Sequence, residues 1–408
     1  MIKKLFIGIL VTYLFSNDAS EFFKYKQNID KEFMNYTNLL NSNFRKYKSS
    51  LDKGFNEYKK KLSKYWEKPE LSSKKIFIQY SKDMKVKNKI DYSKKEIEIS
   101  VISKNKKDAL KVLQQSLSKL VTENTKEAFN KNPVFKKVHK KFQINPNLKP
   151  FIKLSSVSNE PLVSDIIFKT KPTKLKVQEY VNSNINYLNI NQKVSKLKNM
   201  YIYSVKIKLP SKSLLIKARR YKTDVLSKAK RFNIKAALIY AVIHTESSFN
   251  PMARSNIPAF GLMQIVPQTA GIDAYKMLYN EKKILSPSYL YNAKNNILIG
   301  SAYLNEIYYR YMKYIIDPVS RFYCTIAAYN TGVGNVACTF NKGDKLVCSR
   351  SLGDYNIYKA SKKINQMTSS KVLHYMLTNL PYNETKDYLK RVSKRFLMYT
   401  KILNNNAL

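Results

Sequence analysis

The sequence predicts an α+β protein, in which a region of mixed helices and strands is followed by a mainly α-helical region. Runs of alternating or β-branched apolar residues predict four strands, at 75–80, 86–92, 96–102 and 200–210. Beyond residue 210 the apolar residues recur with helical spacing almost to the end. Glycine is rare in the first part and more frequent in the last. We therefore expect one domain over 20–210 and a second over 211–408.

The helical elements follow from their apolar spacing. From about 20 to 66, aromatic and aliphatic residues recur every three or four positions, which predicts one long helix or two helices hinged near Gly54. Its apolar stripe is expected to pack in the core or against a partner, and its Lys-rich opposite face leaves a membrane-surface helix as the alternative. Residues 131–195 give no clear pattern. Further helices are expected at 106–130, 213–231, 235–248, 266–280, 292–312, 318–329 and 384–402.

The first 19 residues predict a secretory signal peptide. Two lysines precede an apolar run from Leu5 to Phe15, and small or polar residues follow, with cleavage expected between Ser16 and Ser20. A short uncleaved anchor is the alternative. This region has no cysteine to which a lipid could be attached. We expect an exported, periplasmic protein, with membrane association left open.

The charge balance favours anionic partners. There are 74 basic and 28 acidic residues, giving a net charge of +46. Such a field attracts bacterial wall polymers or anionic lipid, although a Lys-rich compositional bias explains it equally well. The basic residues do not form a stripe with interleaved aromatic platforms, so nucleic acid is not expected as a partner. The three cysteines and three histidines are not grouped with metal-ligand spacing, so no metal site and no cofactor are expected.

The stretch "IKAALIYAVIHTESSF" carries the candidate catalytic group. It places Glu246 on the same helical face as Ile239, Val242 and Ile243. A carboxyl group on an apolar face tends to hold its proton, because burial disfavours the charged form. A protonated glutamic acid in a cleft is what general acid catalysis requires, whereas a solvated or ion-paired helix-end Glu is the structural alternative.

Three blocks together resemble a known family. "ESSFNPMARSNIPAFGLMQIVPQTAG", "AAYNTGVGNV" and "ETKDYLKRV" are similar, in order and spacing, to the signature blocks of the lytic murein transglycosylases, which have a goose-lysozyme-like catalytic domain. The resemblance covers about residues 211–400. Upstream, "KKIFIQYSKDMKVKNKIDYSKKEIEISV" more loosely resembles the N-terminal domain of the membrane-bound lytic transglycosylase C subfamily. A lysozyme-like catalytic domain is therefore expected.

The resemblance also implies roles for individual residues. Glu246 matches the catalytic acid and base, and Ser247 the structural residue that follows it. The remaining matches are expected to bind the glycan or close its groove, namely Ser255, Met263, Gln264, Tyr329, Asn330, Glu384 and Tyr388. The implied substrate is peptidoglycan, and a monomer is expected.

The implied reaction explains why residues 244–270 hold a single carboxylate. Glycosidases usually use two carboxyl groups. In this family one glutamic acid protonates the glycosidic oxygen, then takes the proton from the C6 hydroxyl of N-acetylmuramic acid, whose oxygen attacks C1 and leaves a 1,6-anhydro end. A goose-type lysozyme hydrolase and an inactive wall-binding protein remain the alternatives.

The late cysteines are expected to be oxidised in an exported protein. A disulfide between Cys338 and Cys348 would close a small loop and leave Cys324 buried and free. Pairing of Cys324 with either of them is the alternative.

Overall fold

The computed structural model describes residues 19–144, 149–341, 345–349 and 353–408. Residues 1–18 of the expected signal peptide lie outside the described residues. Within the described ranges, no helix is both long and apolar enough to cross a membrane. The chain divides into two units, residues 1–50 and 51–408. The following paragraphs concern the second unit, apart from the course of the first helix.

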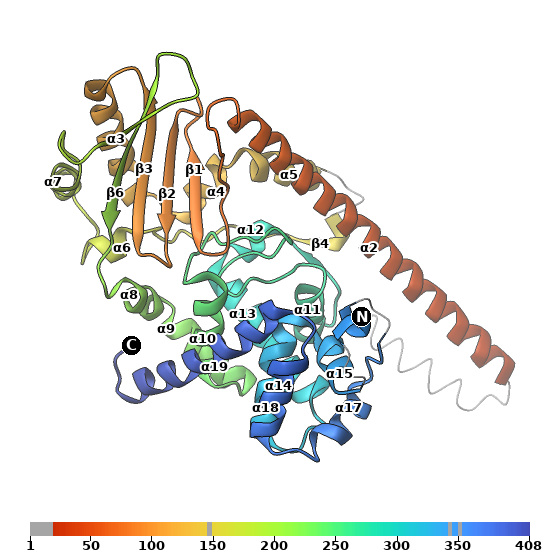
Figure 1. The fold of residues 1–408 in the computed structure, drawn as a ribbon. Coiled ribbons are helices and arrows are strands. Elements are labelled where there is room, and N and C mark those ends of the chain that lie inside the picture. The colour runs from red at the N-terminus through yellow and green to blue at the C-terminus, as the bar shows by residue number, and fades with distance from the viewer. Residues whose placement is uncertain (1–18, 145–148, 342–344, 350–352) are drawn as a thin grey trace. The chain divides into compact units, whose positions relative to one another are not determined.

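An antiparallel sheet organises the N-terminal part of this unit (Figure 1). Its five strands lie in the order β1-β2-β3-β6-β5. In register, Ile97 of β3 lies opposite both Ile90 of β2 and Ile207 of β6. All four predicted strands are present, and a short fifth strand was not predicted. The strands are β1 (Ile76–Tyr80), β2 (Val86–Asp91), β3 (Glu96–Ser103), β5 (Asn191–Val194) and β6 (Tyr201–Lys208).

The predicted N-terminal helix is a single element, α2 (Ala19–Leu62), rather than two helices. From Leu51 onward its apolar face is buried, with Leu51, Phe55 and Leu62 each at most 6% exposed. Leu62 joins Trp66 and residues of β1 in one hydrophobic cluster. The helix continues through Gly54 without a break. A Cβ atom there would lie 2.8 Å from Val134 Cγ1 of α5, so the missing side chain allows a close approach.

The region between β3 and β6 contains more structure than its sequence suggested. The expected helix 106–130 is broken at Glu123, because the Asn124 side chain accepts a hydrogen bond from Glu127 N and starts a new helix. Residues 131–195, which gave no clear pattern, form several short elements. The elements of this region are α3 (Lys106–Thr122), α4 (Thr125–Lys131), α5 (Pro133–Ile144), a 3₁₀ turn η1 (Lys149–Phe151), β4 (Ile152–Lys153), α6 (Ser164–Ile167) and α7 (Lys174–Asn184).

The C-terminal part is almost entirely helical, as predicted (Figure 1). The expected helix 213–231 is interrupted at Tyr221, and 292–312 ends in a π-helical segment. A two-residue parallel pair, β4 with β7 (Ile284–Leu285), links this part to the N-terminal region. The helical elements are α8 (Ser213–Arg220), α9 (Lys222–Phe232), α10 (Ala236–Ser247), α11 (Ala270–Tyr279), α12 (Pro287–Leu290), α13 (Ala293–Asn305), η2 (Glu306–Tyr311), α14 (Pro318–Thr331), α15 (Val333–Asn341), α16 (Lys345–Ser349), α17 (Ile357–Ile364), α18 (Ser369–Asn379) and α19 (Asn383–Asn404).

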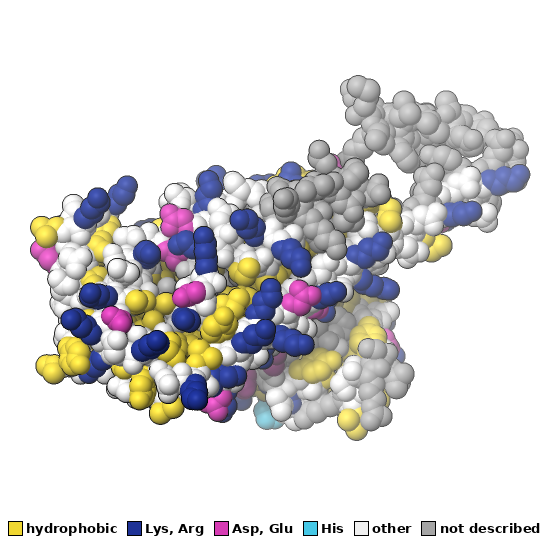
Figure 2. Space-filling view, turned by 90° about the horizontal axis from the view of Figure 1, so that it is seen from above, with side chains coloured by type: hydrophobic (Ala, Val, Ile, Leu, Met, Phe, Trp, Pro, Cys, Tyr) yellow, Lys and Arg dark blue, Asp and Glu magenta, His cyan; other side chains and the backbone are white. Residues whose placement is uncertain are grey.

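The α+β class is therefore confirmed, with the five-stranded sheet and several helices in the N-terminal part and a mainly helical C-terminal part. The boundary near residue 210 stays a prediction; it falls between β6 and α8. Figure 2 shows Lys and Arg side chains spread over the visible face rather than gathered in one stripe, with acidic side chains fewer.

Candidate active site

The candidate catalytic residue lies at the end of a helix that is buried on nearly all sides. Every residue of α10 from Ala237 to Ile243 is at most 5% exposed, and Glu246 itself is 5% exposed. The neighbouring Ser247 is structural: its hydroxyl donates to Ile243 O at 2.9 Å and accepts from Phe249 N at 3.1 Å. Beyond the helix, Ser248 and Phe249 both have positive φ, of 50° and 61°. The chain therefore turns sharply away and leaves Glu246 at the helix end.

The environment of Glu246 raises the pKa of its carboxyl group. Burial is the largest cause, because a buried carboxylate loses its hydration. The pKa is lowered by the charge of Lys74, by the nearby hydroxyl group of Tyr388 and by the charge of Arg391. The charge of Glu384 raises it. The Tyr388 hydroxyl is near this carboxyl group but has no partner at standard hydrogen-bond geometry. Burial outweighs the cations, so the protonated form is favoured relative to an exposed glutamic acid.

The loop after α10 is fixed by one buried amide. Asn296 of α13 accepts from Met263 N at 2.8 Å and donates to Phe260 O and Leu290 O at 2.8 and 2.9 Å. Gly261 has φ of +77°, and a Cβ atom there would lie 2.3 Å from Asn296 Nδ2. Only glycine accommodates both this dihedral angle and this approach. The loop that carries Gln264 is thus held from behind by Asn296.

Three predicted binding residues come from this loop, and their positions differ. Ser255 lines the cleft in front of Glu246, and its hydroxyl donates to Ile257 O. Gln264 also lines the cleft; it is 7% exposed and its Nε2 donates to Gly261 O at 3.0 Å. Its Oε1 has no hydrogen-bond partner among the residues that the structure describes, so a buried acceptor is left over. Met263 is fully buried, packs against Gly300 and is not among the lining residues.

Two further predicted residues come from the end of α14. Tyr329 lines the cleft, but its hydroxyl donates to Met263 O at 2.9 Å, so its polar group already supports the Gln264 loop. Asn330 lines the cleft as well, and its Oδ1 accepts from Thr385 Oγ1 at 2.8 Å. That bond ties α14 to the start of α19.

The last two predicted residues lie in the first turns of α19. The side chain of Glu384 is 68% exposed and lines the cleft. Tyr388 is 2% exposed and lies behind the cleft lining, beside Glu246. Helix α19 packs along α10, which explains how a residue so late in the chain reaches the candidate catalytic group.

The sequence reasoning missed Lys74, which lies just before β1. Its Nζ is 3.7 Å from Glu246 Oε2 and 3.3 Å from Glu384 Oε1. "SSKKIF" shows only a lysine pair at the start of a strand. No local signal distinguishes Lys74 from the many other lysines.

Together these elements enclose a cleft of about 940 Å³. Glu246, Gln264 and Tyr329 lie along its lining, and Lys74 and Glu384 contribute charges. Within the described ranges no group of three or more His, Cys, Asp or Glu is placed to bind a metal ion. The full lining is Lys74, Glu246, Ser255, Asn256, Ile257, Ala259, Gln264, Val266, Tyr329, Asn330, Thr331, Asn335, Pro381, Tyr382, Asn383, Glu384 and Thr385.

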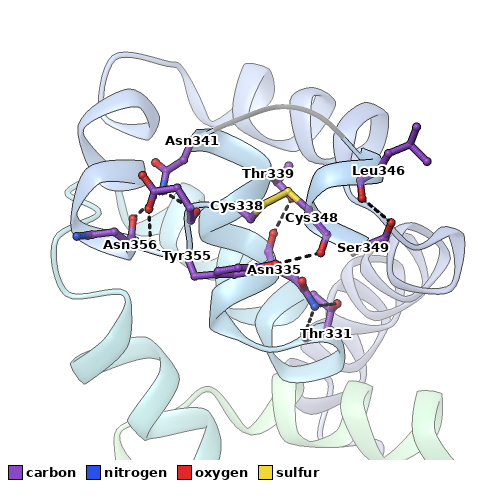
Figure 3. Close-up of a disulfide and its surroundings, with 11 residues drawn as sticks. Thr331, Asn335, Cys338, Thr339, Asn341, Leu346, Cys348, Ser349, Tyr355 and Asn356 are labelled. Carbon is purple, nitrogen blue, oxygen red and sulfur yellow. Dashed lines mark hydrogen bonds between the residues drawn. A yellow bond between two sulfur atoms is a disulfide. The ribbon is translucent and has the colours of Figure 1, made fainter. Parts of the chain in front are cut away.

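A disulfide joins Cys338 of α15 to Cys348 of α16 (Figure 3). Asn335, on the same helix as Cys338, lines the cleft and donates to Thr331 O at 2.8 Å. Cys324 is buried and free. The disulfide therefore braces the helix that follows the Tyr329 and Asn330 block.

The chain is similar to known proteins over this region. Residues 225–346 match the family model described as the transglycosylase SLT domain. The matched stretch of the SLT domain includes Glu246, Gln264 and Tyr329, whereas Lys74 and Glu384 lie outside it.

The chain is also similar to proteins named membrane-bound lytic murein transglycosylase C. The Haemophilus ducreyi protein is 36% identical over 202 residues, covering 48% of this chain and 50% of that protein. The Serratia proteamaculans protein is 38% identical over 192 residues, covering 47% and 50%. The Histophilus somni protein is 31% identical over 257 residues, covering 62% and 66%. The match thus spans about half the length of the first two relatives.

Among solved structures, the chain matches the 70 kDa soluble lytic transglycosylase of Escherichia coli at 23% identity and a TM-score of 0.33. That match covers 45% of this chain and 24% of the other. An inactive mutant of the lytic transglycosylase Slt from Pseudomonas aeruginosa matches at 22% identity and a TM-score of 0.32, covering 45% and 24%.

Proposed function

We propose that this protein is a peptidoglycan lytic transglycosylase that works outside the cytoplasm in cell-wall remodelling or turnover. The SLT domain and the similarity to proteins named lytic murein transglycosylases support this reaction class. The bond cleaved is the β-1,4 bond between N-acetylmuramic acid and N-acetylglucosamine, and the product is a 1,6-anhydro-muramoyl end. The names of the relatives also support association with a membrane. We propose that the protein works as a monomer.

The observation that carries the proposal is the burial of Glu246 at the cleft, which raises the pKa of its carboxyl group. The protonated carboxyl group gives its proton to the glycosidic oxygen as the C1–O bond breaks, and N-acetylglucosamine leaves as an alcohol. The 2-acetamido carbonyl of the muramoyl sugar stabilises the positive charge at C1. The ionised Glu246 then takes the C6 hydroxyl proton, and the C6 oxygen bonds to C1. Glu246 ends protonated, ready for the next cycle.

The substrate is its own nucleophile in this scheme. An intramolecular hydroxyl that is already held near C1 has a large effective concentration, so a positioned water molecule is not required. Gln264 is suited to orient the sugar, because its unpartnered Oε1 can accept a hydrogen bond from an acetamido N–H or a hydroxyl group. Ser255 and Asn330 offer further polar groups along the same cleft.

The test uses purified sacculi, the variant Glu246→Gln and mass spectrometry of the released muropeptides. The wild type should release anhydro-muropeptides, each lighter by one water molecule than the reducing-end product of a hydrolase. Glu246→Gln keeps the shape but not the acid, so it should bind sacculi and lose at least about 100-fold in rate. Full lytic activity in Glu246→Gln would refute the catalytic assignment. Sacculus binding by the wild type without any release would instead favour a wall-binding protein.

A hydrolase is the second candidate, because the structure brings another carboxylate to the cleft. Since Lys74 Nζ contacts both groups, Glu246 Oε2 and Glu384 Oε1 are at most about 7 Å apart. This upper limit overlaps the range of inverting glycosidases, about 6.5–9.5 Å with room for a water molecule, and it also includes the spacing of about 5–5.5 Å in retaining enzymes. In an inverting hydrolase Glu384 would be the general base, as expected for a goose-type lysozyme on the same scaffold.

Glu384→Gln separates the two candidates when its activity is read beside the product mass. A transglycosylase needs no second base, so this variant should keep at least about a tenth of the wild-type rate and still release anhydro products. A hydrolase should lose activity as severely in Glu384→Gln as in Glu246→Gln, and its wild-type products should carry reducing ends.

A further inference from the structure

We propose that Lys74, which lies outside the SLT-domain match, is a positioning residue of the active site that sets the charge state of Glu246 by bridging Glu246 and Glu384. The inference rests on the proposed function, in which Glu246 must carry a proton when substrate binds. Nothing in the family match reaches residue 74, since the matched residues begin at 225.

The backbone around Lys74 is fastened to the loop that follows the catalytic helix. Asn250 is fully buried, and its Nδ2 donates to Lys74 O at 3.3 Å. Arg254 N donates to Ser73 O at 3.4 Å. Ser73 N in turn donates to Ile76 O at 2.8 Å, which begins β1. The segment is therefore held between the sheet and the catalytic loop, and Lys74 lines the cleft.

The side chain of Lys74 sits between two carboxyl groups of different burial. Its Nζ is 3.3 Å from Glu384 Oε1, whose side chain is 68% exposed, and 3.7 Å from Glu246 Oε2, whose side chain is 7% exposed. The pair with Glu384 is close to solvent and weakly stabilising in itself. The contact with Glu246 matters more, because a charge acts more strongly on a group that water does not screen.

The titratable groups around Glu246 come from three segments of the chain. Burial raises the pKa of Glu246, and Lys74 is the first of the influences that lower it. The groups that face Glu246 are Lys74 and Lys75 before β1, Tyr329 on α14, and Glu384, Tyr388 and Arg391 on α19. Lys74 is the cation that is ion-paired with Glu246 within the described part of the chain.

The consequence is a compromise between the two roles of Glu246. Without a nearby cation, burial would hold the proton more tightly, so Glu246 would be a weaker acid, although its carboxylate would be a stronger base. With Lys74 in place, the carboxylate formed after proton donation is stabilised where the charge develops. Lys74 should therefore fix the upper pH limit of activity, because activity requires protonated Glu246 in the free enzyme and is lost as the pH rises through its pKa.

The experiment measures initial rates of muropeptide release from purified sacculi between pH 4 and 9, at constant ionic strength. The full-length wild type is compared with Lys74→Met, Lys74→Arg and Lys82→Met. Lys82 lies in the exposed turn after β1, so its loss matches the change in charge without touching the cleft.

Lys74→Met should move the upper limb of the pH profile to higher pH. Its rate relative to its own maximum, measured well above the wild-type midpoint, should be at least about three-fold higher than that of the wild type. Lys74→Arg should restore the wild-type limb, Lys82→Met should overlay the wild type, and Glu384→Gln should shift the limb the opposite way. A ¹³C-carboxyl NMR titration, with the Glu246 signal assigned by its loss in Glu246→Gln, should show the same shift without any substrate.

Three outcomes overturn the inference. A Lys74→Met profile that overlays the wild type excludes control of Glu246 by Lys74. A fall in sacculus binding with an unmoved pH limb would make Lys74 a ligand for a substrate carboxylate instead. A Lys74→Met variant that unfolds is replaced by Lys74→Gln, and an unshifted Glu246 titration in that variant refutes the inference. Failure of the wild type to release muropeptides would count against the proposed function, whereas the NMR titration still decides the role of Lys74.

Discussion

Replacing Asn296 by Ala is expected to destabilise the fold around the Gln264 loop more than any single change on the cleft surface. The side chain of Asn296 is fully buried and uses all three of its hydrogen bonds on backbone groups, those of Met263, Phe260 and Leu290. Alanine removes these bonds and leaves a small cavity that is too enclosed for free hydration.

The magnitude follows from which groups lose their partner. Phe260 O keeps a bond from Ile265 N at 3.1 Å, so it stays satisfied. Met263 N and Leu290 O lose their bonds from Asn296, and a buried polar group without a partner costs about 1–3 kcal/mol. With the lost third bond, Asn296→Ala should lower the free energy of unfolding by about 3–5 kcal/mol.

The assay is urea unfolding of the wild type, Asn296→Ala and the neighbouring Asn295→Ala. Asn295 is the matched control, because among the described residues its side chain makes a single weak bond, from Nδ2 to Ser155 Oγ at 3.4 Å. Asn295→Ala should change the stability by less than about 1 kcal/mol. If Asn296→Ala fell within that same range, the account of the loop as held by this amide would be wrong.

Two further predictions concern the disulfide and a buried histidine near the site. Reducing the Cys338–Cys348 disulfide, which spans 10 residues, or replacing both cysteines by Ser, should lower the free energy of unfolding by about 2–3 kcal/mol, since a loop of this size is freed in the unfolded chain; an unchanged melting temperature in reducing buffer would contradict this. Burial, aided by Arg395, Lys75 and Lys95, lowers the pKa of His244 to about 3. Below about pH 6.5 the unfolded chain therefore binds a proton at His244 that the folded chain does not bind. Between pH 7 and 5 the free energy of unfolding of the wild type should fall by about 1–2 kcal/mol relative to that of His244→Phe. A stability difference between these two proteins that does not change with pH would argue against the shifted pKa.

The elements that sequence patterns predicted well are those with a strong periodic pattern of apolar residues of their own. Alternating residues in 96–102 and 200–210 predicted β3 and β6 because one face of each strand is buried. The short elements between residues 131 and 195 escaped prediction, because they are held by tertiary contacts such as the pairing of β4 with β7 rather than by their own periodicity.

Some features of the candidate site could likewise be predicted from the sequence, whereas others could not. Glu246 stands out in sequence because a carboxyl group interrupts an apolar helical face, and the three blocks identified its cleft neighbours. Met263 and Tyr388 also belong to those blocks, yet their side chains lie behind the lining rather than along it. A motif gives the order of residues along the chain, whereas side-chain direction depends on how the loop and α19 pack.

By itself, the sequence determined the class of fold, the helix that carries Glu246 and the chemistry proposed for it. Only the tertiary structure decided which charged side chains lie beside Glu246. Lys74 and Glu384 are separated by 310 positions in the chain and meet in one ion pair. Periodicity reports burial over a few turns or strands, whereas an ion pair in a cleft depends on the packing of elements from both ends of the chain.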